Sequence, residues 1–258
     1  MSRAALVTGG GTGIGAAIAR RLRADGYDVC ITGRRREPLD AVAGETGALP
    51  VQGDTGDPGD AEQAVAAAKE AFGRLDVLVC NAGIGLSGTV EEQSPEGWDA
   101  VLRTNLTGAF LACRAAMPEL VRTKGSIVTI SSDAGLRVAP RSSAYCTAKA
   151  GLIMLTQSIA LDFGPLGVRA NCVCPGWIRT PMADGEMDEL AELRGTDREG
   201  AYELVATPVP LRRPGVPDEI AAAVAWLASD EAGFTTGAVI AVDGGNTVVD
   251  PSATVFAP

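Results

Sequence analysis

Short β-branched runs alternate with helical patterns along almost the whole of this 258-residue chain. Such alternation is typical of βαβ units, in which a helix connects each strand to a parallel neighbour. The predicted strands are residues 4–8, 28–32, 49–52, 77–80, 126–131, 169–174 and 239–242. The sequence therefore predicts an α/β fold with one doubly wound, seven-stranded parallel sheet, and its length suits a single domain over residues 1–258.

The residues between these strands have the spacing of amphipathic helices. Ile14, Ile18 and Leu22, for example, recur every four residues, which places them on one helix face. Residues 144–163 are predicted to form one long helix. Another is predicted to begin at Pro217, because two acids follow it at the positive end of the helix dipole. We expect helices on both faces of the sheet.

The segment 181–208 interrupts this pattern. It is acidic, has no strand pattern and is bounded by prolines. Insertions of this length in a compact domain are too long for ordinary loops and tend to be functional. We interpret the segment as a partly helical lid over a site, with a passive surface insertion as the alternative.

Charge and hydropathy exclude several classes of partner. A formal net charge of −10 repels phosphate backbones and anionic lipid headgroups, so we expect no nucleic acid and no membrane as a partner. No run approaches the roughly 20 apolar residues of a membrane span. The N-terminus leads directly into the first predicted strand without the pattern of an export signal, and we expect a cytoplasmic protein.

The chain has six cysteines and no histidine. The absence of histidine excludes Ser-His-Asp and Cys-His triads and imidazole-ligated zinc. The cysteines include no CxxC pair, and most lie in apolar strand-like runs, which favours buried structural thiols over a metal site. We therefore predict no metal, and a catalytic acid or base must be Tyr, Lys, Asp, Glu or Cys.

A glycine-rich segment connects the first predicted strand to the first helix. It reads Thr8-Gly9-Gly10-Gly11-Thr12-Gly13-Ile14-Gly15. Glycines at such a place permit a tight turn and let a pyrophosphate approach the backbone at the positive end of a helix. The spacing differs from the GxGxxG fingerprint, but strand, turn and helix follow in order, so we predict a Rossmann-type dinucleotide site rather than a merely structural turn. The expected cofactor contacts in this turn are Gly9, Gly11, Thr12, Gly13, Ile14 and Gly15.

The end of the second predicted strand bears on the choice of cofactor. Roughly 20 residues after the glycine turn, NAD-binding proteins have an acid for the ribose 2′-hydroxyl, whereas this chain has Gly33-Arg34-Arg35-Arg36. Arg34 and Arg35 could bind a 2′-phosphate through charge-assisted hydrogen bonds. NADP(H) is therefore favoured over NAD(H), and a solvated basic helix start is the alternative.

Tyr145 and Lys149 lie four residues apart on the predicted long helix, so their side chains share one face. A phenol with a pKa of about 10 is a poor catalyst at neutral pH until a nearby ammonium group stabilises the phenolate. Ser132 follows the fifth predicted strand at the carboxyl edge, where open parallel sheets bind ligands. We predict that these three side chains carry out proton transfer on a substrate.

Together these motifs resemble the short-chain dehydrogenase/reductase family, and the resemblance covers nearly the whole chain. The matching elements are Thr8-Gly-x3-Gly13-x-Gly15, Asp54, Asn81-Ala82-Gly83, Asn105, Ser132, Tyr145-x3-Lys149, Pro175-Gly176 and Val242-Asp243-Gly244-Gly245. The resemblance implies a dinucleotide-binding catalytic domain that transfers a hydride between NADP(H) and a ketone or secondary alcohol, similar to ketoreductases and 3-oxoacyl reductases.

The resemblance also implies roles for single residues. Tyr145 would give a proton to a carbonyl or take one from an alcohol, and Ser132 would hydrogen-bond the reacting oxygen. Lys149 would lower the tyrosine pKa and bind the nicotinamide ribose, while Asn105 would position a water in a proton relay. The implied cofactor contacts are Asp54 at the adenine, Asn81, Ala82 and Gly83 at the adenosine half, Ile178 and Thr180 at the carboxamide, and in addition Tyr145, Lys149, Pro175 and Gly176.

A small carbonyl compound or alcohol is the expected substrate, bound beneath the lid. Its predicted contacts are Leu86, Ser132, Asp133, Val138, Tyr145, Trp177 and Met182. Arg137 and Arg141 could recognise an acidic substrate, although exposed loop arginines are the commoner case. Three alternatives stay open: an NAD(H)-dependent alcohol dehydrogenase, a reductase of an imine or another activated double bond, and a non-enzymatic cofactor sensor, which would not need the intact proton-transfer residues.

The resemblance further implies an oligomer. Many relatives are tetramers built through the long helices and the last strand, so we expect a homotetramer or a homodimer. Ala148, Ala150 and Gly151 are small enough to let two such helices approach closely.

Overall fold

The computed structural model, which describes residues 2–250, contains one sheet of seven parallel strands. The strands are β1 (Ala4–Thr8), β2 (Asp28–Gly33), β3 (Leu49–Gln52), β4 (Val77–Cys80), β5 (Ser126–Ile130), β6 (Arg169–Pro175) and β7 (Val239–Val242). Their order across the sheet is β3-β2-β1-β4-β5-β6-β7, so the direction of winding reverses between β1 and β4. The predicted doubly wound fold is confirmed, and such a reversal is where open sheets bind ligands.

The predicted strand limits agree with the structure to within one residue. Gly33 and Pro175 extend β2 and β6 by one residue because each still has a pairing partner, Gln52 and Val242 respectively. β5 ends at Ile130, one residue before the predicted end. The differences are confined to strand ends, where hydrogen bonding fades gradually.

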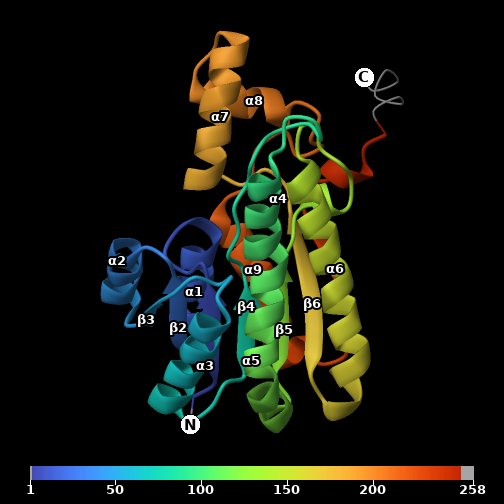
Figure 1. The fold of residues 1–258 in the computed structure, drawn as a ribbon. Coiled ribbons are helices and arrows are strands. Elements are labelled where there is room, and N and C mark those ends of the chain that lie inside the picture. Colours follow the sequence, from blue (N-terminus) through green and yellow to red (C-terminus); the bar gives the residue numbers. More distant parts are fainter. Residues whose placement is uncertain (1, 251–258) are drawn as a thin grey trace.

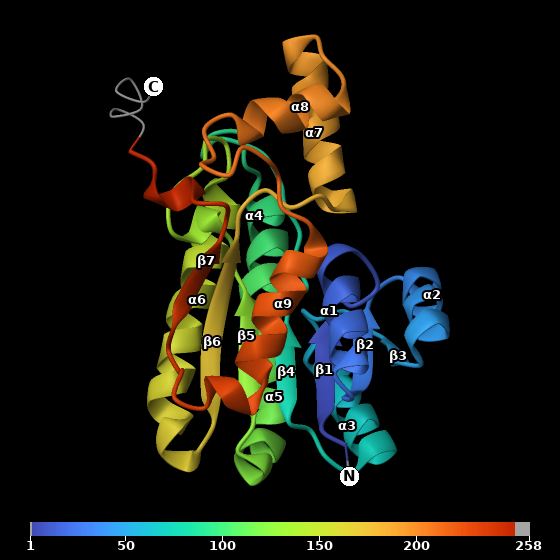
Figure 2. The ribbon, with the colours of Figure 1, turned by 180° about the vertical axis from the view of Figure 1, so that it is seen from behind.

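Helices cover both faces of the sheet, as expected. They are α1 (Gly13–Ala24), α2 (Arg36–Thr46), α3 (Pro58–Phe72), α4 (Pro95–Leu102), α5 (Gly108–Thr123), α6 (Ser143–Phe163), α7 (Pro181–Arg194), α8 (Arg198–Ala206) and α9 (Pro217–Ala228). Figure 1 shows α3, α4, α5 and α6 in front of the sheet, and Figure 2 shows α1 and α9 on the opposite face. The long predicted helix begins one residue earlier than expected, at Ser143.

The apolar core lies in two layers, one on each face of the sheet. In β1, Ala5 and Val7 pack with α1 and α9, whereas Leu6 between them packs with α3 and α5. Successive side chains of a strand point to opposite faces, and both faces are buried in a doubly wound fold. The run of apolar residues in β1 is therefore continuous. All six cysteines are buried as free thiols, as their apolar surroundings predict.

The segment predicted as a lid forms α7 and α8, which project beyond the carboxyl ends of the strands (Figure 1). Tyr202 is only 1% exposed in a small apolar core between the two helices, and its hydroxyl donates to Asp184 at 2.8 Å. Arg179 binds Glu199 through two hydrogen bonds of 2.8 and 2.7 Å. The partly helical structure is confirmed, and the function of a lid stays a prediction.

Candidate active site

A cavity of about 1210 Å³ lies at the carboxyl edge of the sheet. The glycine turn, the ends of β2, β4, β5 and β6, and the inner side of α7 line it. Every predicted cofactor and substrate residue borders this cavity. The one predicted catalytic residue that does not is Asn105. The topology has thus brought together residues from the first to the last third of the chain.

The glycine turn is compact and is anchored from β4. Gly9 and Gly13 have φ angles of 66° and 53°, which lie in the left-handed region that favours glycine. A Cβ atom on Gly15 would lie 2.1 Å from the carbonyl oxygen of Gly9, so no other residue fits there without a shift of the turn. Asn81 Nδ2 donates to the carbonyl oxygens of Thr8 and Gly9 at 3.0 and 3.2 Å. Asn81 therefore supports the turn with its side chain, besides bordering the cavity.

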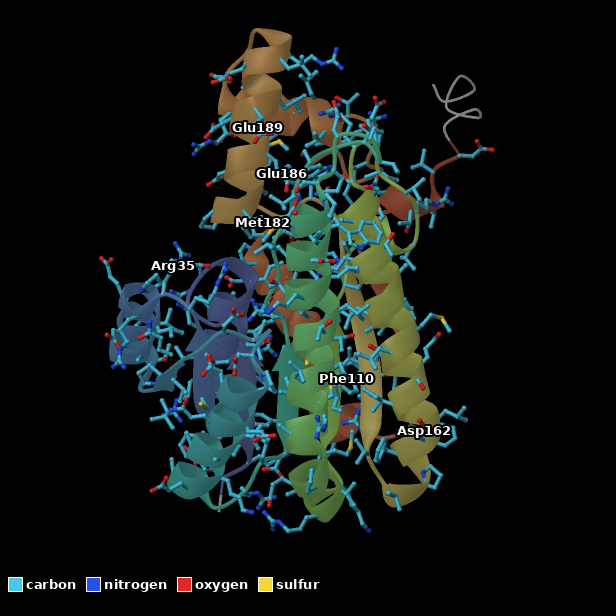
Figure 3. The ribbon with its side chains drawn as sticks, in the orientation of Figure 1. Arg35, Phe110, Asp162, Met182, Glu186 and Glu189 are labelled. Atoms are coloured by element: carbon cyan, nitrogen blue, oxygen red, sulfur yellow. The ribbon has the colours of Figure 1, made fainter. Side chains whose placement is uncertain are left out.

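The three consecutive arginines after β2 separate into two groups. Arg34 and Arg35 border the cavity, and their guanidinium groups have no hydrogen bond or ion pair with another residue of the described range 2–250. Arg36 instead binds Asp40, four residues along α2, at 2.7 Å. Figure 3 labels Arg35 at the start of α2, below the lid. Two cationic groups thus remain available to a ligand in the cavity.

Tyr145, Ser132 and Lys149 meet at the opposite end of the cavity. Lys149 is 4% exposed, and its Nζ donates to the carbonyl oxygen of Ile130 at 2.8 Å while lying 5.5 Å from the centre of the Tyr145 ring. Ser131 Oγ donates to the carbonyl oxygen of Lys149 at 2.8 Å and is buried. Ser132 is therefore the serine beside the tyrosine, as the spacing predicted.

Burial shifts the pKa values of both ionisable groups. Enclosure raises the pKa of Tyr145 above its usual range, and a hydrogen bond with Ser132 partly opposes this shift. Burial lowers the pKa of Lys149 to about 8. In the free protein Tyr145 thus keeps its proton at neutral pH, which is the state that a general acid needs.

Asn105 lies behind the cavity, in a π-helical turn, Arg103–Thr107, between α4 and α5. It is 1% exposed, and its amide group both accepts from the backbone N–H of Ile84 and donates to the Ile84 carbonyl, each at 2.8 Å. A Cβ atom on Gly83 would lie 3.2 Å from Asn105 Oδ1 and 3.5 Å from Lys149 Nζ. The side chains of Asn105 and Lys149 therefore both approach the Cα atom of Gly83, and they are close to one another because glycine has no side chain to keep them apart. π-Helical turns of this kind are frequent at functional sites.

Comparison with known proteins identifies the family. The model of the family described as enoyl-(acyl carrier protein) reductase matches residues 9–247. Protein MoaE of Klebsiella aerogenes is 41% identical over 100% of both chains. Meso-2,3-butanediol dehydrogenase of Serratia marcescens is 37% identical over 96% of each chain. The chain belongs to the short-chain dehydrogenase/reductase family.

The structure agrees with this membership. A crystal structure of a variant of actinorhodin polyketide ketoreductase with NADPH superposes with a TM-score of 0.92 at 33% identity, and covers 96% of this chain and 98% of that one. As a short-chain dehydrogenase/reductase, the protein is an NAD(P)-dependent oxidoreductase of alcohols and ketones.

Among residues 2–250, no cluster of three or more His, Cys, Asp or Glu side chains is suited to a metal ion. No helix within that range has the length and hydropathy to cross a membrane.

The remaining family positions border the cavity with contacts of their own. Asp54 accepts from the backbone N–H of Gly56 at 3.0 Å and forms an ion pair of 3.3 Å with Arg103. Thr180 caps the N-terminus of α7, since its hydroxyl accepts from the N–H of Ala183 at 3.2 Å. The other predicted residues that border the cavity are Gly11, Thr12, Ile14, Ala82, Gly83, Leu86, Asp133, Val138, Pro175, Gly176, Trp177, Ile178 and Met182.

Sequence reasoning missed several polar residues of the cavity, and three of them lie just after the last strand and on the lid. Asn246 and Thr247 follow β7, and Glu186 lies on α7. Two signals could have found them. The last strand ends at the same sheet edge as the others, so the residues just after it are candidate site residues. Glu186 follows the predicted substrate contact Met182 by four residues on one helix, so the two side chains share a helix face.

Proposed function

We propose that this protein is an NADP(H)-dependent oxidoreductase of ketones and secondary alcohols in which Tyr145 acts as general acid and base. The observation that carries the proposal is the meeting of Ser132, Tyr145 and Lys149 at one end of a cavity whose other end is formed by the glycine turn and Arg34. Such a site can hold a dinucleotide and a small substrate side by side. A screen of ketones and secondary alcohols with each cofactor, followed by nicotinamide absorbance, tests it.

The side chains suit the charge that develops in carbonyl reduction. When a nicotinamide cofactor is bound, it supplies the hydride that is added to the carbonyl carbon. The carbonyl oxygen then gains negative charge, which Ser132 can stabilise with a hydrogen bond while Tyr145 donates its proton. The nearby cationic Lys149 stabilises the phenolate that is left. In alcohol oxidation the same groups act in reverse.

The preference for NADP(H) is supported by Arg34 and Arg35. Two guanidinium groups without partners in the described chain border the cavity directly after β2, and such groups suit a 2′-phosphate. The related ketoreductase structure contains NADPH. Both arginines are exposed, as the alternative of a solvated basic helix start also expects, and Arg35 makes no side-chain hydrogen bond to the start of α2.

Replacing Arg34 by alanine is expected to weaken NADPH binding by about 10- to 100-fold, because a charge-assisted contact to phosphate is lost. NADH binding should change little. Titration of the parent and of Arg34→Ala with both cofactors, read by fluorescence, gives the four affinities. Arg36→Ala is the matched control, since Arg36 is bound to Asp40 outside the cavity. Tighter binding of NADH than of NADPH by the parent would overturn the preference.

A reductase of an activated carbon–carbon double bond is the second candidate, because the matching family model is described as an enoyl reductase. An imine reductase and an NAD(H)-dependent alcohol dehydrogenase stay open as further alternatives. The cytoplasmic location also stays a prediction.

We further propose that the protein is a homotetramer. Phe110 on α5 and Met154 and Leu161 on α6 are 47%, 64% and 78% exposed, and Figure 3 shows Phe110 on the outer side of α5. β7 is an edge strand, whose free hydrogen-bonding groups can pair with a second copy. Light scattering should give about four times the chain mass. A monomer at micromolar concentration would contradict the proposal.

A further inference from the structure

We propose that the substrate carries a positively charged amino group next to its reacting carbonyl, and that the carboxylates of Asp133 and Glu186 bind this group. The inference rests on the proposed function and names the substrate class of the same site. Asp133 and Glu186 approach the cavity from different elements, Asp133 directly after the catalytic Ser132 and Glu186 from α7.

Asp133 is held in place at the reacting end of the cavity. Its Oδ2 accepts from Asn246 Nδ2 at 2.8 Å, and its Oδ1 accepts from Ser132 Oγ at 3.0 Å. When the Ser132 hydroxyl turns to the substrate oxygen, Oδ1 loses this donor. A carboxylate oxygen in a half-buried site is stabilised by a new donor, most strongly by a charged one. A donor on the carbon next to the carbonyl can take its place, because the same Ser132 hydroxyl reaches either Asp133 Oδ1 or the substrate oxygen and the two acceptors are therefore neighbours.

Glu186 brings a second negative charge from the lid. Its Oε1 would lie 3.4 Å from a Cβ atom on Gly85, so the side chain extends across the cavity to the loop after β4. Figure 3 labels Met182, Glu186 and Glu189 in order along α7. Glu186 makes no hydrogen bond or ion pair with another residue of the described chain. The Glu186 side chain is exposed toward the open cavity, where partial desolvation and the neighbouring charge of Glu189 raise its pKa.

The two acids act on the reacting hydroxyl itself. Burial raises the pKa of Tyr145, the hydrogen bond with Ser132 lowers it, and the charges of Glu186 and Asp133 raise it further. The substrate carbonyl oxygen would bind to the Tyr145 hydroxyl, so the negative potential of the two acids also acts on that oxygen. A cation bound between them would cancel this potential and make proton exchange at Tyr145 easier.

The arginines near the cavity do not balance these acids. Arg141 forms an ion pair of 2.9 Å with Glu92 outside the site. Arg137 borders the cavity without an ion pair in the described chain, but its side chain is exposed on the loop between β5 and α6, and Lys149 is bound to the Ile130 carbonyl beneath the tyrosine. Three carboxylates that border the cavity, those of Asp133, Glu186 and Glu189, thus outnumber the one arginine of this loop that has no ion pair, so the alternative that these arginines recognise an acidic substrate is not favoured. The apolar residues Leu86, Val138, Trp177 and Met182 can contact the uncharged part of the substrate.

Three ketones of nearly equal size test the inference: 1-aminopropan-2-one, 2-butanone and acetoacetate, which carry an ammonium, a methyl and a carboxylate group at the same position. We expect kcat/KM for the aminoketone to exceed that for 2-butanone by at least about tenfold, and acetoacetate to be the poorest. Glu186→Gln should lower the ratio between aminoketone and 2-butanone by about tenfold. Glu192→Gln, an exposed position on α7 outside the cavity, is the matched control and should keep the parent ratio.

The outcomes separate the two proposals. Reduction of 2-butanone or acetoacetate in preference to the aminoketone overturns the inference and leaves the proposed function standing. An unchanged ratio in Glu186→Gln equally overturns the assignment of Glu186. If no ketone in this set or in the wider screen is reduced with either cofactor, both proposals fail.

Discussion

Replacing Tyr145 by phenylalanine is expected to lower kcat by about 10² to 10⁴, the contribution of a positioned general acid. The variant loses only the hydroxyl group, so the ring still packs in the site and the Lys149 ammonium still lies over it. NADPH affinity should stay within about twofold of the parent, because the glycine turn and Arg34 bind the far end of the cofactor. Steady-state reduction of the best ketone and fluorescence titration of NADPH measure the two quantities.

The control for this variant is Tyr27→Phe. The Tyr27 hydroxyl also lies in a buried setting, where it donates to the Ala228 carbonyl at 3.3 Å, but Tyr27 is not part of the cavity. Parent-like turnover in Tyr27→Phe, with a large loss in Tyr145→Phe, would assign the effect to proton transfer. Undiminished turnover in Tyr145→Phe would contradict the mechanism.

Replacing Gly15 by alanine is expected to weaken NADPH binding by at least about tenfold and to destabilise the fold by about 1–3 kcal/mol. The added Cβ would lie 2.1 Å from the Gly9 carbonyl oxygen and 2.5 Å from Asn81 Nδ2. The turn must therefore open, and the hydrogen bonds from Asn81 that support it are strained or lost. Denaturant unfolding and cofactor titration measure both effects.

Gly44→Ala is the matched control for this substitution. Gly44 is also a helical glycine, in α2, but a Cβ atom there meets nothing within 4 Å. Alanine at an open helical position should stabilise the protein by up to about 1 kcal/mol, because glycine loses more backbone entropy on folding. NADPH affinity that is equal in Gly15→Ala and in the parent would show that the turn does not bind the cofactor.

Most of the fold could be predicted because its pattern is local. The five inner strands are short apolar runs buried on both faces, the edge strands β3 and β7 are only partly buried, and the limits of all seven were visible to within one residue. The helix start at Pro217 was also visible, because proline and acids mark a helix N-terminus. The two helices of the lid have a weaker pattern, since their small core around Tyr202 depends on contacts between α7 and α8.

The site could be predicted only where a motif carries its residues. Gly9 to Gly15 and the pair Tyr145 and Lys149 are each encoded within one turn or one helix. The hydrogen bond between Asp133 and Asn246 joins residues 113 positions apart, and the contact of Glu186 with the loop at Gly85 depends on how the lid packs. Local spacing contains no signal for such pairs, because only the tertiary fold brings them together.

Transfer of deuterium tests the central claim most directly. The protein is incubated with a ketone on which it consumes NADPH, the NADPH carries deuterium at both C4 positions of the nicotinamide, and the product is analysed by mass spectrometry and NMR. The account predicts one deuterium on the carbinol carbon of a secondary alcohol, formed as NADPH is consumed, and loss of this product in Tyr145→Phe. Deuterium at a carbon of a reduced double bond or next to an amine, with the carbonyl left intact, would contradict it.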